Sequence, residues 1–140
     1  MNIHHYTDNP DADWQGEPGA DDAAIARLLE WAGVELPTDY LDFLRTSNGG
    51  EGEFDVYPEY LRLWPIDTVL SANEGYQIQT YLPGFIGIGD SGGSDVVAID
   101  LRAEGAFTLQ AFLFSSLALE EAMFVASSVE GLFKSVKRRE

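Results

Sequence analysis

The sequence predicts an α+β domain in which helices at both ends of the chain pack on an antiparallel sheet. Residues 21–50 contain two stretches whose apolar residues recur at helical spacing. The middle of the chain changes to alternating apolar and polar residues, which is typical of strands. The last stretch again has helical spacing. Runs of strands between helical ends favour the α+β class.

The chain length is that of one domain, because 140 residues can bury a core but are too few for two ordinary domains. We expect a single domain over residues 20–140. Residues 1–19 are polar and acidic. They indicate a loosely held leader, which Tyr6 and Trp14 could pin to the domain.

Two helices are expected at the start of the domain. The first covers about Asp22–Ala32, with Asp21 or Asp22 as its cap. The second covers about Thr38–Ser47, with Thr38 or Asp39 as its cap. It ends at Asn48-Gly49-Gly50, because these residues tolerate positive φ. The proline-containing link between the helices predicts a helical hairpin.

The rest of the chain predicts mainly strands. They are expected over 53–57, 60–64, 85–90, 95–101 and 107–114. A short helix is expected over 66–73, and a closing helix over 127–138 with Ser127 or Ser128 as its cap. Residues 115–126 leave two alternatives, a helix through Leu119–Phe124 or a loop across the domain.

The net charge of −16 is the strongest compositional feature. It disfavours direct binding to nucleic acids and to anionic membranes, and it favours basic proteins and cations. The same charge could also serve solubility alone. The chain has no cysteine, which excludes disulfides and thiolate chemistry. The sequence shows no secretory signal and no run of 18 apolar residues, so we expect a cytoplasmic protein.

Two short motifs resemble catalytic or nucleotide-binding strings but lack the rest of the site. Residues 89–93 read GDSGG, as around the nucleophile of trypsin-like proteases, but the only histidines are His4 and His5 in the leader. Residues 87–92 match G-x-G-x-x-G, yet a strand follows where a phosphate site needs a helix. We therefore expect no enzyme, metal or cofactor. A cation or small ligand at the Asp90–Asp95 turn stays an alternative.

The order of these segments resembles the SUKH superfamily, the cell-wall-assembly-regulator type of domain that is widespread in bacteria. Its leucine-proline and asparagine-glycine-glycine signatures match Leu36-Pro37 and Asn48-Gly49-Gly50. Its isoleucine–glycine–acidic–glycine–aspartate signature matches Ile88-Gly89-Asp90, Gly92-Gly93 and Asp95. The resemblance covers about residues 22–137 and implies a mixed, mostly antiparallel sheet with flanking helices.

The resemblance also implies a function. Many bacterial members are immunity proteins that bind and block a toxin, often a nuclease, and the family has no shared catalytic residues. We expect a basic cognate toxin as partner, with a non-inhibitory regulatory module as the alternative; the oligomeric state stays open. The candidate partner-binding residues are acidic: Glu51, Glu53, Asp55, Glu59, Glu74, Asp90 and Asp95.

Overall fold

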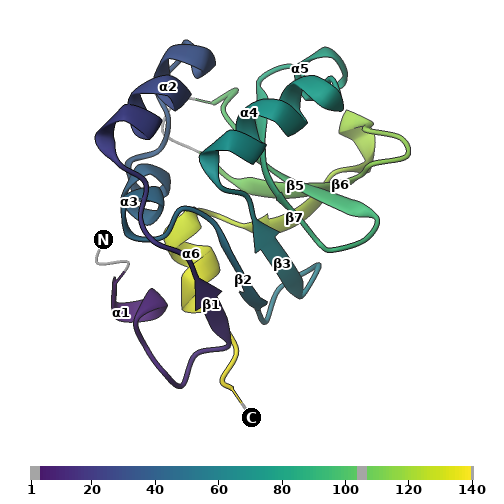
Figure 1. Cartoon of the computed structure of the whole chain (residues 1–140). Coiled ribbons are helices and arrows are strands. Elements are labelled where there is room, and N and C mark those ends of the chain that lie inside the picture. Colours follow the sequence, from purple (N-terminus) through teal and green to yellow (C-terminus); the bar gives the residue numbers. More distant parts are fainter. Residues whose placement is uncertain (1–3, 104–106, 140) are drawn as a thin grey trace.

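One antiparallel sheet organises the molecule, and its seven strands follow one another in chain order. The computed structural model describes residues 4–103 and 107–139. In Figure 1, α4 and α5 lie over one face of the sheet and α6 lies against the other. The strands are β1 (Trp14–Gly16), β2 (Gly50–Glu53), β3 (Tyr60–Leu63), β4 (Phe85–Asp90), β5 (Asp95–Asp100), β6 (Leu109–Leu113) and β7 (Met123–Ala126). The helices are α1 (His4–Thr7), α2 (Asp22–Ala32), α3 (Thr38–Thr46), α4 (Ile66–Gly75), α5 (Ile78–Tyr81) and α6 (Val129–Lys134), with a 3₁₀ turn, η1 (Leu119–Glu121). The α+β prediction and the mostly antiparallel sheet are confirmed.

Helix α2 forms as its sequence predicts. The Asp21 carboxylate accepts a hydrogen bond from the Ala24 N–H at 2.8 Å, and Gly33 ends the helix with φ +66°. Helix α3 differs, because neither Thr38 nor Asp39 caps it. The Asp39 carboxylate instead accepts from the Glu130 N–H of α6 at 2.9 Å. One carboxylate thus ties the start of α3 to the first turn of α6.

The Asn48-Gly49-Gly50 motif joins α3 to both β2 and α4. The Asn48 side-chain oxygen accepts a hydrogen bond from the Ile66 N–H at 2.9 Å, and so caps α4 from a distance in sequence. Gly49 has φ +92°, and a Cβ there would lie 2.7 Å from the Leu63 carbonyl oxygen. Only glycine allows this close approach, which explains why the motif ends in glycines.

Strand β2 corrects the strand predicted over 53–57, because it begins and ends earlier. A Cβ at Gly52 would lie 2.2 Å from the Asp13 carbonyl oxygen, so glycine lets β1 pair closely with β2. Residues 54–59 then reverse the chain and include Pro58, which has no N–H for a ladder. The alternation in this stretch reflects a turn with one buried residue, Phe54, and not a strand.

The C-terminal region differs most from expectation. Residues 115–126 are neither the predicted helix nor a simple loop, because a 3₁₀ turn leads into β7, which pairs with β6. The closing helix is also shorter than 127–138. After α6 the chain becomes extended, and residues 136 and 138 form bridges to Phe54 and Ala12. This pairing with distant segments ends the helix, although its residues favour continuation.

Trp14 brings the expected leader into the core. Its side chain is 4% exposed, and its ring packs edge-on against Phe133 with centroids 5.0 Å apart. Phe43 and Phe54 complete this aromatic cluster between α3, α6 and the sheet. Tyr6 also packs against the core. Within the predicted leader, Trp14–Gly16 therefore forms an edge strand of the sheet.

Strands β4 and β5 are buried along their whole length, so they form the centre of the fold. Helix α4 is fixed to β4 by the fully buried Asn73, whose amide binds both the N–H and the carbonyl of Gly87. No helix among the described residues has the length and apolar character that a membrane span needs.

Candidate interaction surface

The outer side of β2 and β3 presents a row of charged side chains. Glu51 and Glu53 are exposed, while Gly52 between them is buried. The register places Glu51 opposite Arg62, and Arg62 opposite Asp90. The three charged residues therefore lie side by side across β2, β3 and β4, with the cation between the two carboxylates.

Asp90 is largely enclosed and binds three donors. One carboxylate oxygen accepts from Arg62 Nε at 2.9 Å and from the Gly92 N–H at 2.7 Å. The other accepts from the Trp64 indole N–H at 2.7 Å. The hydrogen bond to Asp90 raises the pKa of Arg62. Because its side chain is only 13% exposed, Asp90 fixes the β4–β5 turn and offers little surface to a partner.

Asp95 does not pair with Asp90, which corrects the idea that the two carboxylates approach across the turn. Asp90 lies opposite Val96 in the sheet. Adjacent residues of a strand point to opposite faces, so Asp95 points away from Asp90. Its carboxylate instead accepts from the Tyr57 hydroxyl at 3.0 Å. The pKa of Tyr57 is raised by partial burial and by this carboxylate.

The turn of residues 54–59 adds further carboxylates and one cation. Asp55 and Glu59 are exposed. Lys137 Nζ lies 2.9 Å from a Glu59 carboxylate oxygen, and this hydrogen bond lowers the pKa of Glu59. The backbone of Lys137 also joins β1 and β2, since its N–H donates to the Glu53 carbonyl and its carbonyl accepts from the Asp13 N–H. The basic C-terminal segment therefore borders the acidic turn.

Tyrosines accompany these carboxylates. The Tyr60 hydroxyl donates a hydrogen bond to the Glu51 carboxylate, which raises the pKa of Tyr60. The Tyr60 ring lies against the β4–β5 turn, where a Cβ at Gly92 would come within 3.0 Å of it. Tyr57 is 41% exposed. Such amphipathic side chains suit protein interfaces, because they bury apolar area and still form hydrogen bonds.

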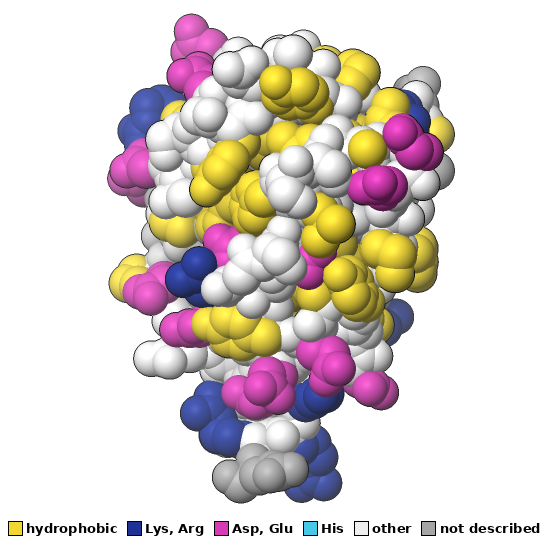
Figure 2. Space-filling view, turned by 90° about the vertical axis from the view of Figure 1, so that its right-hand side faces the viewer, with side chains coloured by type: hydrophobic (Ala, Val, Ile, Leu, Met, Phe, Trp, Pro, Cys, Tyr) yellow, Lys and Arg dark blue, Asp and Glu magenta, His cyan; other side chains and the backbone are white. Residues whose placement is uncertain are grey.

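We call these residues the acidic–aromatic surface: Glu51, Glu53, Asp55, Tyr57, Glu59, Tyr60 and Arg62. Asp90 and Asp95 adjoin it, but both are buried and they point to opposite faces of the sheet. Six of the seven predicted acidic residues thus belong to neighbouring strands and turns. Glu74 does not, because it lies on α4, outside these strands and turns. Figure 2 shows a face with a broad area of apolar side chains; carboxylates lie below this area and also along its upper left and upper right edges.

A groove of about 460 Å³ borders the acidic–aromatic surface. Three aromatic side chains contribute to its walls, and two of them, Tyr76 and Phe114, pack together with ring centroids 4.5 Å apart. Arg62 belongs to both the groove and the surface, and its partner Asp90 lines the groove. The residues that line the groove are Arg62, Trp64, Thr68, Ala72, Tyr76, Asp90, Gly92, Gly93 and Phe114.

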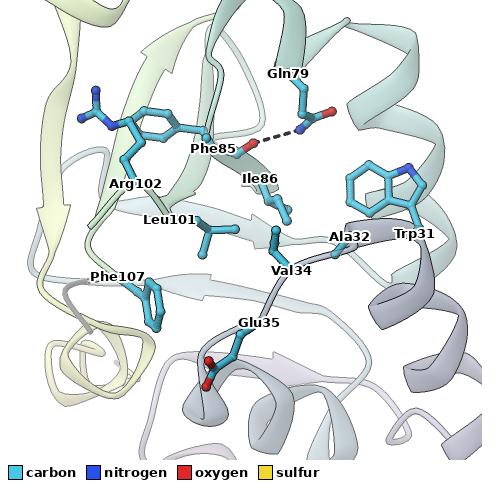
Figure 3. Close-up of a pocket in the computed structure, with 11 residues that line it drawn as sticks. Trp31, Ala32, Val34, Glu35, Gln79, Phe85, Ile86, Leu101, Arg102 and Phe107 are labelled. Atoms are coloured by element: carbon cyan, nitrogen blue, oxygen red, sulfur yellow. Dashed lines mark hydrogen bonds between the residues drawn. The ribbon is translucent and has the colours of Figure 1, made fainter. Parts of the chain in front are cut away.

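A second pocket, of about 610 Å³, lies between the end of α2 and the β5–β6 connection (Figure 3). Two of its polar side chains, Gln79 and Arg102, already serve the fold. The Gln79 amide donates to the Phe85 carbonyl oxygen at 2.9 Å. Arg102 lies over the Phe85 ring and forms two hydrogen bonds with the Asp100 carboxylate, which lower the pKa of Asp100. Glu35 also lines the cavity, together with apolar side chains such as Leu101 and Phe107.

The catalytic-looking motifs act as turn structure. In the GDSGG string, the Ser91 hydroxyl oxygen accepts from the Asp95 N–H at 3.1 Å. Residues 95–100, which follow the G-x-G-x-x-G string, form a strand as expected. Within the described part of the chain, no group of three His, Asp or Glu side chains is placed to hold a metal ion.

Sequence reasoning missed the aromatic part of the site. Tyr57, Tyr60 and Tyr76 were not among the candidate residues, because nothing in their spacing shows that they lie beside the acidic strands. Tyr60 immediately follows the acidic turn, and this proximity was the one signal available.

The fold and its motifs agree with comparison to known proteins. The model of the SMI1 / KNR4 family (SUKH-1) matches residues 19–135. The chain therefore belongs to this family, a class of immunity-like or regulatory binding domains. A search of curated proteins finds none that matches the chain.

Proposed function

We propose that this protein is an immunity-type binding protein that neutralises a basic protein toxin through the acidic–aromatic surface. The proposal is supported mainly by the finding that a member of the SUKH-1 family presents this acidic–aromatic surface. It combines four exposed carboxylates, those of Glu51, Glu53, Asp55 and Glu59, with Tyr57 and Tyr60. The nearby cations are Arg62 and Lys137. A nuclease or similar enzyme with a basic cleft would complement it.

Electrostatic attraction would give such an inhibitor its speed. Complementary charge raises association rates by orders of magnitude over neutral pairs, and the effect falls with ionic strength. A net charge of −16 provides long-range attraction, and the exposed Glu53 and Asp55 provide local complementarity. The aromatic side chains would then supply the buried contact that slows dissociation.

The first test asks whether the protein protects bacterial cells that express the toxin encoded beside it.

The second test measures the rate at which variants of the protein associate with the purified toxin. The double variant Glu53→Lys with Asp55→Lys reverses two exposed charges of the surface. The matched control, Glu30→Lys with Glu35→Lys, makes the same change of net charge at exposed positions outside it. We expect the first variant to slow association about tenfold at low salt and the control to change it much less.

Three outcomes would count against the proposal. If the wild-type protein gives no protection, the neutralising function is wrong. If the partner is harmless when expressed alone, the protein is instead a regulatory module of the same fold. If both charge-reversed variants slow association equally, net charge alone drives binding and the acidic–aromatic surface has no special part.

A further inference from the structure

The groove beside the acidic–aromatic surface is lined by three aromatic side chains, Trp64, Tyr76 and Phe114, together with polar groups such as Arg62 and Thr68. The Asp90 carboxylate already accepts from the Trp64 indole and from Arg62. Among the aromatic side chains of the groove, Tyr76 is 49% exposed and stacks on Phe114. An apolar side chain that entered the groove would bury area against these two rings. A volume of about 460 Å³ is in the range of ligand pockets.

The neighbouring charges indicate what surrounds that apolar side chain. On the β2 side of the groove, Arg62 lies opposite Glu51, and Glu53 follows on the same outer face. An anchor bordered by Lys or Arg would meet these carboxylates. A second copy of this chain would instead bring another net charge of −16 against the same surface, which opposes self-association.

We propose that the groove receives an aromatic or large aliphatic side chain of the protein partner, flanked by basic residues. This inference rests on the proposed function, since the partner is the toxin. Anchors that fill a pocket next to a charged rim commonly dominate the affinity of an interface, and the rim mainly sets the association rate.

Gly93 offers a way to fill the groove without disturbing the fold. A Cβ there would meet only the Ser91 hydroxyl oxygen, at 4.0 Å, and its φ is not positive. Because Gly93 lines the groove, Gly93→Gln adds a polar side chain at its edge. Gly75→Gln is the matched control, because Gly75 is also open and is not part of the groove lining. Both variants should unfold like the wild type in thermal denaturation.

The probes are three short peptides, added to the ¹⁵N-labelled full chain and followed by NMR. Acetyl-Lys-Phe-Lys-amide should shift the Trp64 indole and Gly92 amide signals saturably at millimolar concentration. Acetyl-Lys-Ser-Lys-amide, without an apolar anchor, and acetyl-Glu-Phe-Glu-amide, without basic neighbours, should bind at least about tenfold more weakly. Gly93→Gln should abolish the shifts, and Gly75→Gln should retain them.

Equal binding of the Lys-Ser-Lys peptide, or shifts confined to other parts of the protein, would overturn the inference. Binding of the toxin to the wild type and to Gly93→Gln tests the groove and the proposed function separately. If it binds Gly93→Gln within twofold of the wild type, the anchor groove is wrong and the proposed function stands. If it does not bind the wild type, the proposed function fails, and the peptides still decide whether the groove accepts such an anchor.

Discussion

Removing the Asn73 side chain should separate α4 from the sheet. Its amide nitrogen donates to the Val69 carbonyl at 2.6 Å and to the Gly87 carbonyl at 2.9 Å. Its amide oxygen accepts from the Gly87 N–H at 2.8 Å and from Gln79 Nε2 at 2.9 Å. Asn73 is fully buried, so no water replaces these bonds in the folded protein.

The expected cost of Asn73→Ala follows from the groups it leaves unpaired. The N–H and the carbonyl of Gly87 each lose a buried partner, at about 1–3 kcal/mol apiece. We expect a total loss of about 3–5 kcal/mol, a large part of the stability of an ordinary domain. Gln79→Ala should cost only about 1 kcal/mol, because Gln79 is exposed and its amide makes two of the neighbouring bonds.

Urea and thermal unfolding monitored by circular dichroism measure both variants. A third variant, Asn73→Leu, fills similar space but forms no hydrogen bonds. Comparison of Asn73→Leu with Asn73→Ala separates the stability lost through a cavity from the stability lost through unpaired backbone groups of Gly87. If Asn73→Leu is as stable as the wild type, the reasoning from hydrogen bonds is refuted. Ala72 of the groove lies on α4 and Tyr76 directly follows this helix, so a destabilised α4 should also weaken binding of the anchor peptide.

Three further predictions concern stability. Asn48→Ala should cost about 1 kcal/mol in urea unfolding, because the Ile66 N–H at the start of α4 loses its cap. Tyr40→Phe should change stability by less than about 1 kcal/mol at pH 7, because the Tyr40 hydroxyl has no hydrogen-bond partner among the described residues. Burial raises the pKa of Tyr40, so above about pH 10 its hydroxyl ionises in the unfolded chain but not in the folded one, and the free energy of unfolding of the wild type should fall. Over the same range the free energy of unfolding of Tyr40→Phe should fall by up to about 1.4 kcal/mol less per pH unit. Arg102 lowers the pKa of Asp100, so stability should fall below about pH 4, and Asp100→Asn should lose less over that range in thermal scans.

Local signals predicted those elements that local interactions define. Asp21 and Gly33 bound α2 as expected, since a cap and a left-handed residue act within a few positions of the chain. Strand β7 could not be predicted in this way, because it exists through pairing with β6. The same holds for residues 136–138, which leave the predicted helix to form bridges with Ala12 and Phe54. Long-range pairing therefore overrides helical spacing in the C-terminal region.

The charged residues of the candidate site could be predicted from the sequence, but the residues that surround them could not. The sequence pointed to Glu51, Glu53 and Asp55 as one acidic stretch, and the structure keeps them together. It could not reveal that Asp90 is enclosed by Arg62 and Trp64. Nor could it show that the groove combines residues from α4, β3 and the β4–β5 turn, because those contacts depend on sheet register.

The bond between Lys137 and Glu59 gives the acidic–aromatic surface its own tethered counterion. A lysine held beside a carboxylate by the chain competes with any free cation at an effective concentration on the order of millimolar. Basic proteins that engage a single carboxylate at micromolar concentration therefore gain little at this turn. A partner that engages several carboxylates and an apolar groove together outcompetes the tether, so the C-terminal segment would make the surface more selective than its charge suggests.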